Sequence, residues 1–315
     1  MAPLFPLEVP RIPMTRSGTK SPDPAGPFRP EESFALDLDR NDSLAPMRDR
    51  FHLPTAADGR PVIYFCGNSL GLQPIAARAI IDREMDDWAR LGVEGHFQAR
   101  SPWYSYHETL REPAAGIVGA LPHEVVAMNS LTVNLHLMMA TFYRPTPERH
   151  RVLIEDRAFP SDVYAVQSQI RHHRFDPAGS LLVVRPRDGE DALLTEDLER
   201  IIEKQGSEIA LVLLGGVQYH TGQSFAIEAI TAAARRQGCV VGFDYAHAAG
   251  NVILRSHDWD VDFAVWCSYK YLNGGPGAVG GCFVHERHGR DLSLPRFAGW
   301  WGTDPETRFQ MHLNT

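Results

Sequence analysis

The chain has 315 residues, of which 43% are hydrophobic, and its formal net charge is −8. This length and apolar content are enough for a large buried core, whereas the negative charge excludes the basic surface by which proteins bind nucleic acids or anionic membranes. No apolar stretch approaches the roughly 20 residues that a membrane-spanning helix needs, so neither a nucleic-acid partner nor a membrane is expected.

The first 30 residues are rich in proline, arginine and serine and lack the apolar segment of a secretory signal. We therefore expect residues 1–30 to form a disordered tail and the protein to be cytoplasmic. The cysteines all adjoin apolar residues and show no metal-ligand spacing, which predicts free, buried, reduced thiols and no structural metal. They are Cys66, Cys239, Cys267 and Cys282.

Residues 31–72 form an irregular N-terminal segment. Pro74 then opens a predicted helix, because proline is tolerated in a first turn, and helically spaced apolar residues continue it to Gly92. Further on, Thr195 is predicted to cap a helix that stops at Gly206, and another helix ends at Gly238.

Apolar runs alternate with these helical patterns. They are continuous rather than alternating, which predicts strands buried on both faces. This order predicts an α/β fold, a three-layer sandwich with a mainly parallel central sheet. The runs lie at 152–154, 181–184, 209–214, 239–243, 262–267 and 279–284.

An acidic residue and a lysine follow two of the predicted strands. Asp244 directly follows the run 239–243, where an ionised carboxylate is costly without a partner. Lys270 comes shortly after the run 262–267, although lysine is rarely buried. A lysine that forms a Schiff base and an acid that keeps a pyridine nitrogen protonated are what pyridoxal 5′-phosphate (PLP) requires. The pair therefore indicates PLP. The competing interpretations are a helix N-cap for Asp244 and a lysine that reaches water for Lys270.

Nearby residues offer further contacts to such a cofactor. Tyr269 can donate to phosphate or move a proton, and His247 is either a polar neighbour of the cofactor or a core histidine. Ser130 begins a helical stretch whose free N–H groups suit an anion, unless it is an ordinary N-cap. Phe159 can stack on a flat ring or pack in the core.

The glycine-rich run from Gly274 to Gly281 contains a formal dinucleotide-binding pattern. That pattern must open a helix, whereas the residues after it, Cys282 to Val284, look like a strand. We therefore interpret the glycines as a tight turn beside Lys270.

From about Tyr64 to Trp301 the chain resembles the kynureninase family, which consists of PLP enzymes of the aspartate-aminotransferase-like fold (fold type I). The resemblance rests on separated motifs rather than on one pattern. They are Gly67-Asn68-Ser69-Leu70-Gly71, Gly95-His96, Asn129 to His136, Phe159-Pro160-Ser161-Asp162, Tyr219-His220-Thr221-Gly222-Gln223, Gly242-Phe243-Asp244-Tyr245-Ala246-His247, Val261 to Asn273 and Gly299-Trp300-Trp301-Gly302.

The resemblance implies roles for individual residues. Lys270 would hold PLP, Asp244 would pair with its ring nitrogen, and Tyr269 would also act in catalysis. His96 would lie near the aromatic end of the substrate. Trp300 would reach the phosphate from the other subunit of a homodimer with shared active sites. The remaining implied cofactor contacts are Leu131 and Thr132 at the phosphate, Phe159 on the ring, and Pro160, Ser161, Asp162 and His247.

The implied reaction is hydrolysis of L-kynurenine, or its 3-hydroxy form, to L-alanine and anthranilate or 3-hydroxyanthranilate, in tryptophan catabolism and de novo NAD biosynthesis. Lys270 would move the proton at Cα, and Tyr269 would supply the proton that completes alanine. The alternative enzyme is a cysteine desulfurase-like PLP lyase, but that family has histidine directly before its lysine and Tyr269 stands there instead.

The implied organisation is a small-domain segment at 31–72, a large PLP-binding domain at 73–300 and the start of a small domain at 301–315. Family members continue with a substantial C-terminal part, which carries an arginine for the substrate carboxylate and an asparagine near the cofactor. We therefore expect an incomplete small domain, and a truncated product with little or no activity is the second alternative. Thr303 also stands where the family usually has histidine.

Overall fold

The computed structural model describes residues 28–311, so nearly all of the predicted tail lies outside the described residues. Contacts divide the described residues into two units, residues 28–62 with 72–106 and residues 63–71 with 107–311. This division groups residues 72–106 with the N-terminal segment, whereas the predicted large domain starts at 73. The predicted domain functions stay predictions.

The first unit is helical in its described part. Helix α2 ends where Gly92 adopts a φ of +53°, as its sequence predicted. The buried carboxylate of Asp87 on this helix accepts the backbone N–H of Arg100 at 2.8 Å and its guanidinium Nε at 3.0 Å, which ties α2 to the segment after α3. The elements are α1 (Glu32–Asn41), η1 (Ala45–Arg50), α2 (Ala76–Leu91), η2 (Gly92–Glu94) and α3 (Gly95–Gln98).

The second unit is built on a seven-stranded sheet with the order β1-β7-β6-β5-β4-β2-β3. β7 runs antiparallel to both of its neighbours, and the other pairs are parallel, so the predicted mainly parallel sheet is confirmed. Six of the strands match the predicted apolar runs. The strands are β1 (Val125–Ala127), β2 (Arg151–Glu155), β3 (Leu181–Val184), β4 (Ile209–Gly215), β5 (Val240–Asp244), β6 (Phe263–Trp266) and β7 (Gly281–Val284).

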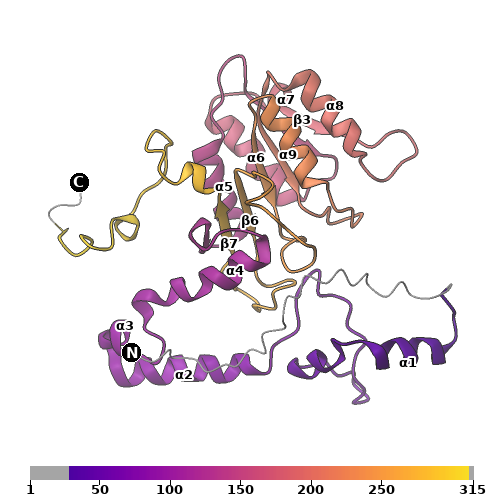
Figure 1. Ribbon diagram of the computed structural model, residues 1–315, viewed down its shortest axis with the longest axis vertical. Coiled ribbons are helices and arrows are strands. Elements are labelled where there is room, and N and C mark those ends of the chain that lie inside the picture. The colour runs from indigo at the N-terminus through magenta and orange to yellow at the C-terminus, as the bar shows by residue number, and fades with distance from the viewer. Residues whose placement is uncertain (1–27, 312–315) are drawn as a thin grey trace. The chain divides into compact units, whose positions relative to one another are not determined.

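Helices cover both faces of this sheet (Figure 1), which confirms the three-layer sandwich. One core joins the sheet to α4 (Arg111–Val118), α8 (Thr195–Gln205) and α9 (Ile227–Arg236). The other joins it to α5 (Leu131–Phe142) and α6 (Pro160–His172). Short helices complete the unit: η4 (Pro122–Glu124), α7 (Pro177–Ser180), η5 (Glu286–His288) and η6 (Trp300–Gly302), while η3 (Trp103–Leu110) spans the division between the units.

Both faces of each central strand are apolar because successive side chains enter different cores. On β2, Leu153 belongs to the core with α8 and α9, and Val152 and Ile154 belong to the core with α5 and α6. This explains why the predicted strands read as continuous apolar runs. None of the helices within residues 28–311 combines the length and apolar composition of a membrane span.

Three local predictions are wrong. Residues 31–72, predicted to be irregular, contain α1 and η1. Thr195 is the first helical residue of α8, and Leu194 takes the N-cap position without a side-chain cap; Glu196 and Asp197 instead place negative charge at the positive end of the helix. Cys66 is exposed, unlike the other three free cysteines, because it lies in a turn in which its carbonyl accepts the N–H of Ser69 at 2.8 Å.

Candidate active site

Lys270 lies at the carboxyl edge of the sheet, in the connection between β6 and β7. Its side chain is only 8% exposed. The Nζ atom is 2.8 Å from Nε2 of His247 and 5.7 Å from the ring centroid of Phe159. The structure therefore brings the predicted lysine together with an imidazole and an aromatic face, contributed by segments that follow β5 and β2.

The glycine-rich run after Lys270 forms a tight turn, as predicted. Gly275 and Gly277 adopt φ values of +84° and +77°, which side chains disfavour. The N–H of Gly274 donates to the carbonyl of Ser268 at 2.8 Å, which closes the connection on itself. β7 follows directly, so this segment opens no helix and the dinucleotide interpretation is excluded.

Two buried aspartates face the lysine from neighbouring elements. Asp244 is the last residue of β5, and Asp162 is in the first turn of α6. Burial raises the pKa of Asp162, and the charge of Asp244 raises it further. Burial also raises the pKa of Asp244, opposed by its interactions with Asp162, the N–H of Ala246 and the charge of Lys270. We infer that the two carboxyls share one proton, held mainly by Asp162.

A third buried carboxyl was not among the predicted site residues. Glu155 is the last residue of β2 and only 5% exposed. Burial raises its pKa to about 7, and Asp244 contributes to the rise. The sequence signal that could have found it is its position directly after the apolar run 152–154, the same position that singled out Asp244 after 239–243.

His247 and Tyr269 differ in the proton state that their surroundings favour. Burial and the charge of Lys270 lower the pKa of His247 to about 4. At neutral pH its imidazole is therefore uncharged and accepts a hydrogen bond from the ammonium of Lys270. Burial and the adjoining Cys267 raise the pKa of Tyr269 to about 12, so this phenol keeps its proton and is able to donate it.

Two helix N-termini meet beside this cluster. Oγ1 of Thr132 in α5 and Oγ of Ser161 in α6 are 2.9 Å apart and share a hydrogen bond. Neither helix has a side-chain cap, so first-turn N–H groups stay available for an anion. A Cβ added at Gly280 would lie 3.4 Å from the backbone nitrogen of Leu131, and glycine keeps the approach to that N–H open.

These groups fit PLP. Oδ1 of Asp162 is buried and lacks a hydrogen-bond partner within residues 28–311, which is costly unless another group supplies a donor. Together, Asp162 and Asp244 suit a protonated ring nitrogen, Lys270 suits the aldehyde, and the paired helix N-termini suit the phosphate. PLP is therefore the cofactor that this arrangement accommodates.

Three predicted residues lie at the margin of this arrangement or outside it. Pro160 is exposed at the start of α6. Trp300 packs against Phe309, and its Nε1 donates to the carbonyl of Arg308 at 2.7 Å. His96 belongs to the first unit, where its ring meets Trp103 edge-on at 5.6 Å. The cofactor role of Trp300 and the substrate role of His96 stay predictions.

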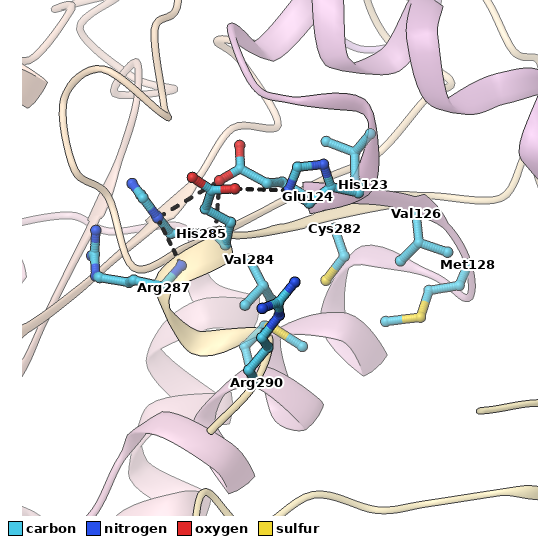
Figure 2. Close-up of a pocket in the computed structure, with 13 residues that line it drawn as sticks. His123, Glu124, Val126, Met128, Cys282, Val284, His285, Arg287 and Arg290 are labelled. Carbon is cyan, nitrogen blue, oxygen red and sulfur yellow. Dashed lines mark hydrogen bonds and ion pairs between the residues drawn. The ribbon is translucent and has the colours of Figure 1, made fainter. Parts of the chain in front are cut away.

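A separate cavity of about 890 Å³ opens beside β1 and β7 (Figure 2). Figure 2 shows His123, Glu124 and His285 near one another on its wall, with Val126, Met128 and Cys282 grouped elsewhere. Neither Lys270 nor the aspartate pair lines it. We therefore do not assign this cavity as the active site, although it is large.

A cluster of residue types that can bind a metal ion lies at this cavity. It consists of Glu124, His257 and His285. These residues already have hydrogen-bond partners. Oε1 of Glu124 accepts the N–H of Glu286 at 2.7 Å and meets Nδ1 of His257 at 3.0 Å, and Nδ1 of His285 accepts the N–H of Arg287 at 3.2 Å. We interpret the cluster as a polar link between η4 and the end of β7. Sequence spacing gave no signal of it, because the three residues are far apart in the chain.

Comparison with known proteins matches residues 74–299 to the family Aminotransferase class-V. A kynureninase of Koribacter versatilis (strain Ellin345) is 60% identical over 287 residues, which are 91% of this chain and 68% of the relative. A kynureninase of Myxococcus xanthus (strain DK1622) is 59% identical over 90% of this chain and 67% of the relative. The chain thus spans about two thirds of the length of these relatives.

Solved structures resemble the chain at lower identity. An apo cysteine desulfurase from Thermococcus onnurineus NA1 superposes with a TM-score of 0.56 at 20% identity, covering 80% of this chain and 57% of that one. A mutant of the enzyme C-DES, with glycine covalently linked to its PLP cofactor, gives a TM-score of 0.59 at 20% identity, covering 75% and 60%. At such identities these likenesses show the fold alone.

Proposed function

The chain belongs to the kynureninase family within the class-V aminotransferases, and on that premise we propose that it hydrolyses L-kynurenine or 3-hydroxy-L-kynurenine. The products are L-alanine and anthranilate or 3-hydroxyanthranilate. The observation that carries the proposal is the buried Lys270, whose Nζ lies 2.8 Å from His247, in a chain 60% identical to a curated kynureninase.

PLP, when bound, supplies an electron sink for a carbanion formed at the carbon that bears the substrate amine. Asp244 would accept a hydrogen bond from the protonated ring nitrogen, because burial disfavours its carboxylate and a further positive charge beside it would offset that cost. Lys270 is the base that removes the proton from Cα of the amino acid. His247 takes a hydrogen bond from Nζ and carries no charge at neutral pH. It therefore orients the lysine amine without adding a second positive charge beside it.

Tyr269 supplies a proton late in the reaction. Water adds to the γ-carbonyl of the substrate, the Cβ–Cγ bond breaks, and the aryl acid leaves. Cβ then needs one proton to complete L-alanine. The phenol of Tyr269 has a pKa raised to about 12, so it is protonated at neutral pH and is the donor we assign to this step.

The first turns of α5 and α6 bind the phosphate in this proposal. Leu131 contributes an N–H group, and Thr132 and Ser161 contribute hydroxyls that already share a hydrogen bond. Phe159 presents its ring toward the cofactor site, where its centroid is 5.7 Å from the amine of Lys270. Trp300 of a second copy and His96 complete the predicted site.

The cellular setting belongs to the same proposal. We place the enzyme in the cytoplasm, as a homodimer with shared active sites, in tryptophan catabolism and de novo NAD biosynthesis. The family membership supports the pathway. The predicted reach of Trp300 into a partner's site is what supports the dimer.

The direct test is fluorescence of released anthranilate from the purified chain, PLP and L-kynurenine. Wild-type chain is expected to release anthranilate, and Lys270→Ala is expected to release none, because the base and cofactor anchor are lost together. Lys204→Ala, at an exposed position on α8, is the matched control and should keep wild-type turnover. Normal turnover in Lys270→Ala would contradict the proposed site.

A further inference from the structure

Glu155 lies on the same edge of the sheet as the aspartate pair. It ends β2, Gly215 ends the adjacent β4, and Asp244 ends β5 beyond it. In the β4–β5 register, Gly215 and Asp244 are direct partners. The three strand ends therefore form a row that leads from Glu155 to the carboxylate proposed to hold the cofactor's ring nitrogen.

A glycine separates the two acids in this row. Both carboxylate oxygens of Glu155 face the N–H of Gly215, at 3.3 Å and 3.4 Å. A Cβ at position 215 would lie 3.3 Å from Oε1 of Glu155, so the missing side chain leaves the carboxyl close to that strand. Backbone N–H groups of Gly215 and of Glu155 itself donate to this carboxyl, and neither carries a charge that would balance a carboxylate buried away from water.

The charges around Glu155 are unbalanced. Its acidic neighbours are Asp244 on β5 and Asp162 on α6, and both interact with it electrostatically. The cationic group facing the same cluster is Lys270, while His247 is uncharged at neutral pH and Tyr269 keeps its proton. Asp162 and Asp244 share one proton, so the groups left to balance are the carboxylate of Asp244, the carboxyl of Glu155 and one ammonium. Two ionised carboxylates beside one ammonium would be costly in a buried site, so Glu155 is favoured to keep a proton of its own.

We propose that Glu155 is a positioning residue for the cofactor's ring nitrogen. It is a third carboxyl beside the Asp162–Asp244 pair, and it keeps a proton of its own in the cofactor-free chain. Its protonation state therefore controls how much negative charge surrounds the ring-nitrogen site. When a protonated ring nitrogen docks against Asp244, Glu155 releases its proton to solvent. No bond other than this O–H changes. Affinity for PLP therefore increases with pH as Glu155 ionises.

The test measures PLP affinity by equilibrium dialysis between about pH 6 and about pH 8.5. Glu155→Gln keeps the size and the acceptor for Gly215 but holds no ionisable proton. We expect the ratio of its Kd to that of wild type to grow about tenfold over this range, which corresponds to a coupling of one pKa unit. Glu228→Gln, at an exposed position on α9, is the matched control and its ratio should stay constant. A constant ratio for Glu155→Gln would overturn the proposal.

A second variant is used if circular dichroism shows that Glu155→Gln does not fold. Glu155→Asp keeps a titrating carboxyl that is one methylene shorter and farther from Asp244. The pH at which PLP affinity rises should move down, and an unchanged midpoint would refute the role. The inference rests on the cofactor assignment and not on the substrate, because dialysis uses PLP alone. A chain that hydrolyses no kynurenine leaves it standing, and one that binds no PLP overturns it.

Discussion

Stability of the cofactor-free chain should depend on pH through Glu155, and the size of the effect follows from its surroundings. Burial and Asp244 raise the pKa of this carboxyl from 4.5 to about 7. The folded chain therefore holds the proton more tightly than the unfolded chain does. Each pKa unit is worth about 1.4 kcal/mol, and Glu155 is buried, so the linked free energy between about pH 5 and about pH 8 is about 2.5 kcal/mol.

The sign is set by which state binds the proton. Stability from protonated Glu155 is fully present below the unfolded pKa, and it is lost as pH rises through about 7. Glu155→Gln has no proton to lose. The free energy of unfolding of Glu155→Gln minus that of wild type should therefore increase by about 2.5 kcal/mol between about pH 5 and about pH 8.

Urea denaturation followed by circular dichroism measures this difference at both pH values. The comparison between the two proteins cancels the titration of other groups, as long as both unfold in one transition. A difference between the two proteins that is the same at both pH values would refute the reasoning, because it would mean that Glu155 is already ionised in the folded chain.

Three further predictions concern the site and the core. Asp244→Asn should lower turnover by about 10²-fold or more, because breaking a buried charge pair costs about 3–5 kcal/mol; anthranilate release measures it, and wild-type turnover would contradict the role. Tyr269→Phe should lower kcat by about 10²–10⁴-fold, and stopped-flow traces should show slow alanine formation after normal proton loss at Cα. Gly242→Ala should destabilise the fold by about 1–3 kcal/mol, since its Cβ would collide with the ring of Phe263. Thermal unfolding measures the loss. The control is Gly116→Ala on α4, where an added Cβ meets open space and no destabilisation is expected.

Much of the sheet was predictable because its strands are buried on both faces. Runs such as 209–214 are apolar at every position, and β4 is buried at all but its last residue, so burial and sequence carry the same information. β1 was not among the predicted runs. It has only three residues and depends on its pairing with β7, which local sequence does not encode.

The candidate site was predictable to the extent that its residues are unusual for their location. An acid and a lysine directly after apolar runs stand out, and the structure brings Asp244, Lys270 and His247 together. Glu155 also directly follows a predicted apolar run, 152–154, but that run has only three residues and indicated burial less strongly than the run before Asp244. The cap of α8 was predicted wrongly because Thr195 has the right side chain one position too late.

The antiparallel β7 has a consequence for the order of folding. β1 joins the sheet through β7, and the paired residues Val125 and Phe283 are separated by 158 positions in the chain. Closing such a long loop is slow compared with forming local contacts. Helix α5, which carries the proposed phosphate contacts, follows β1 after a short turn. The turn before this helix bonds to Gly280, where the N–H of Met128 donates to its carbonyl at 3.0 Å. We therefore expect the N-terminus of α5 to gain its final contacts only after the polypeptide has been synthesised past β7.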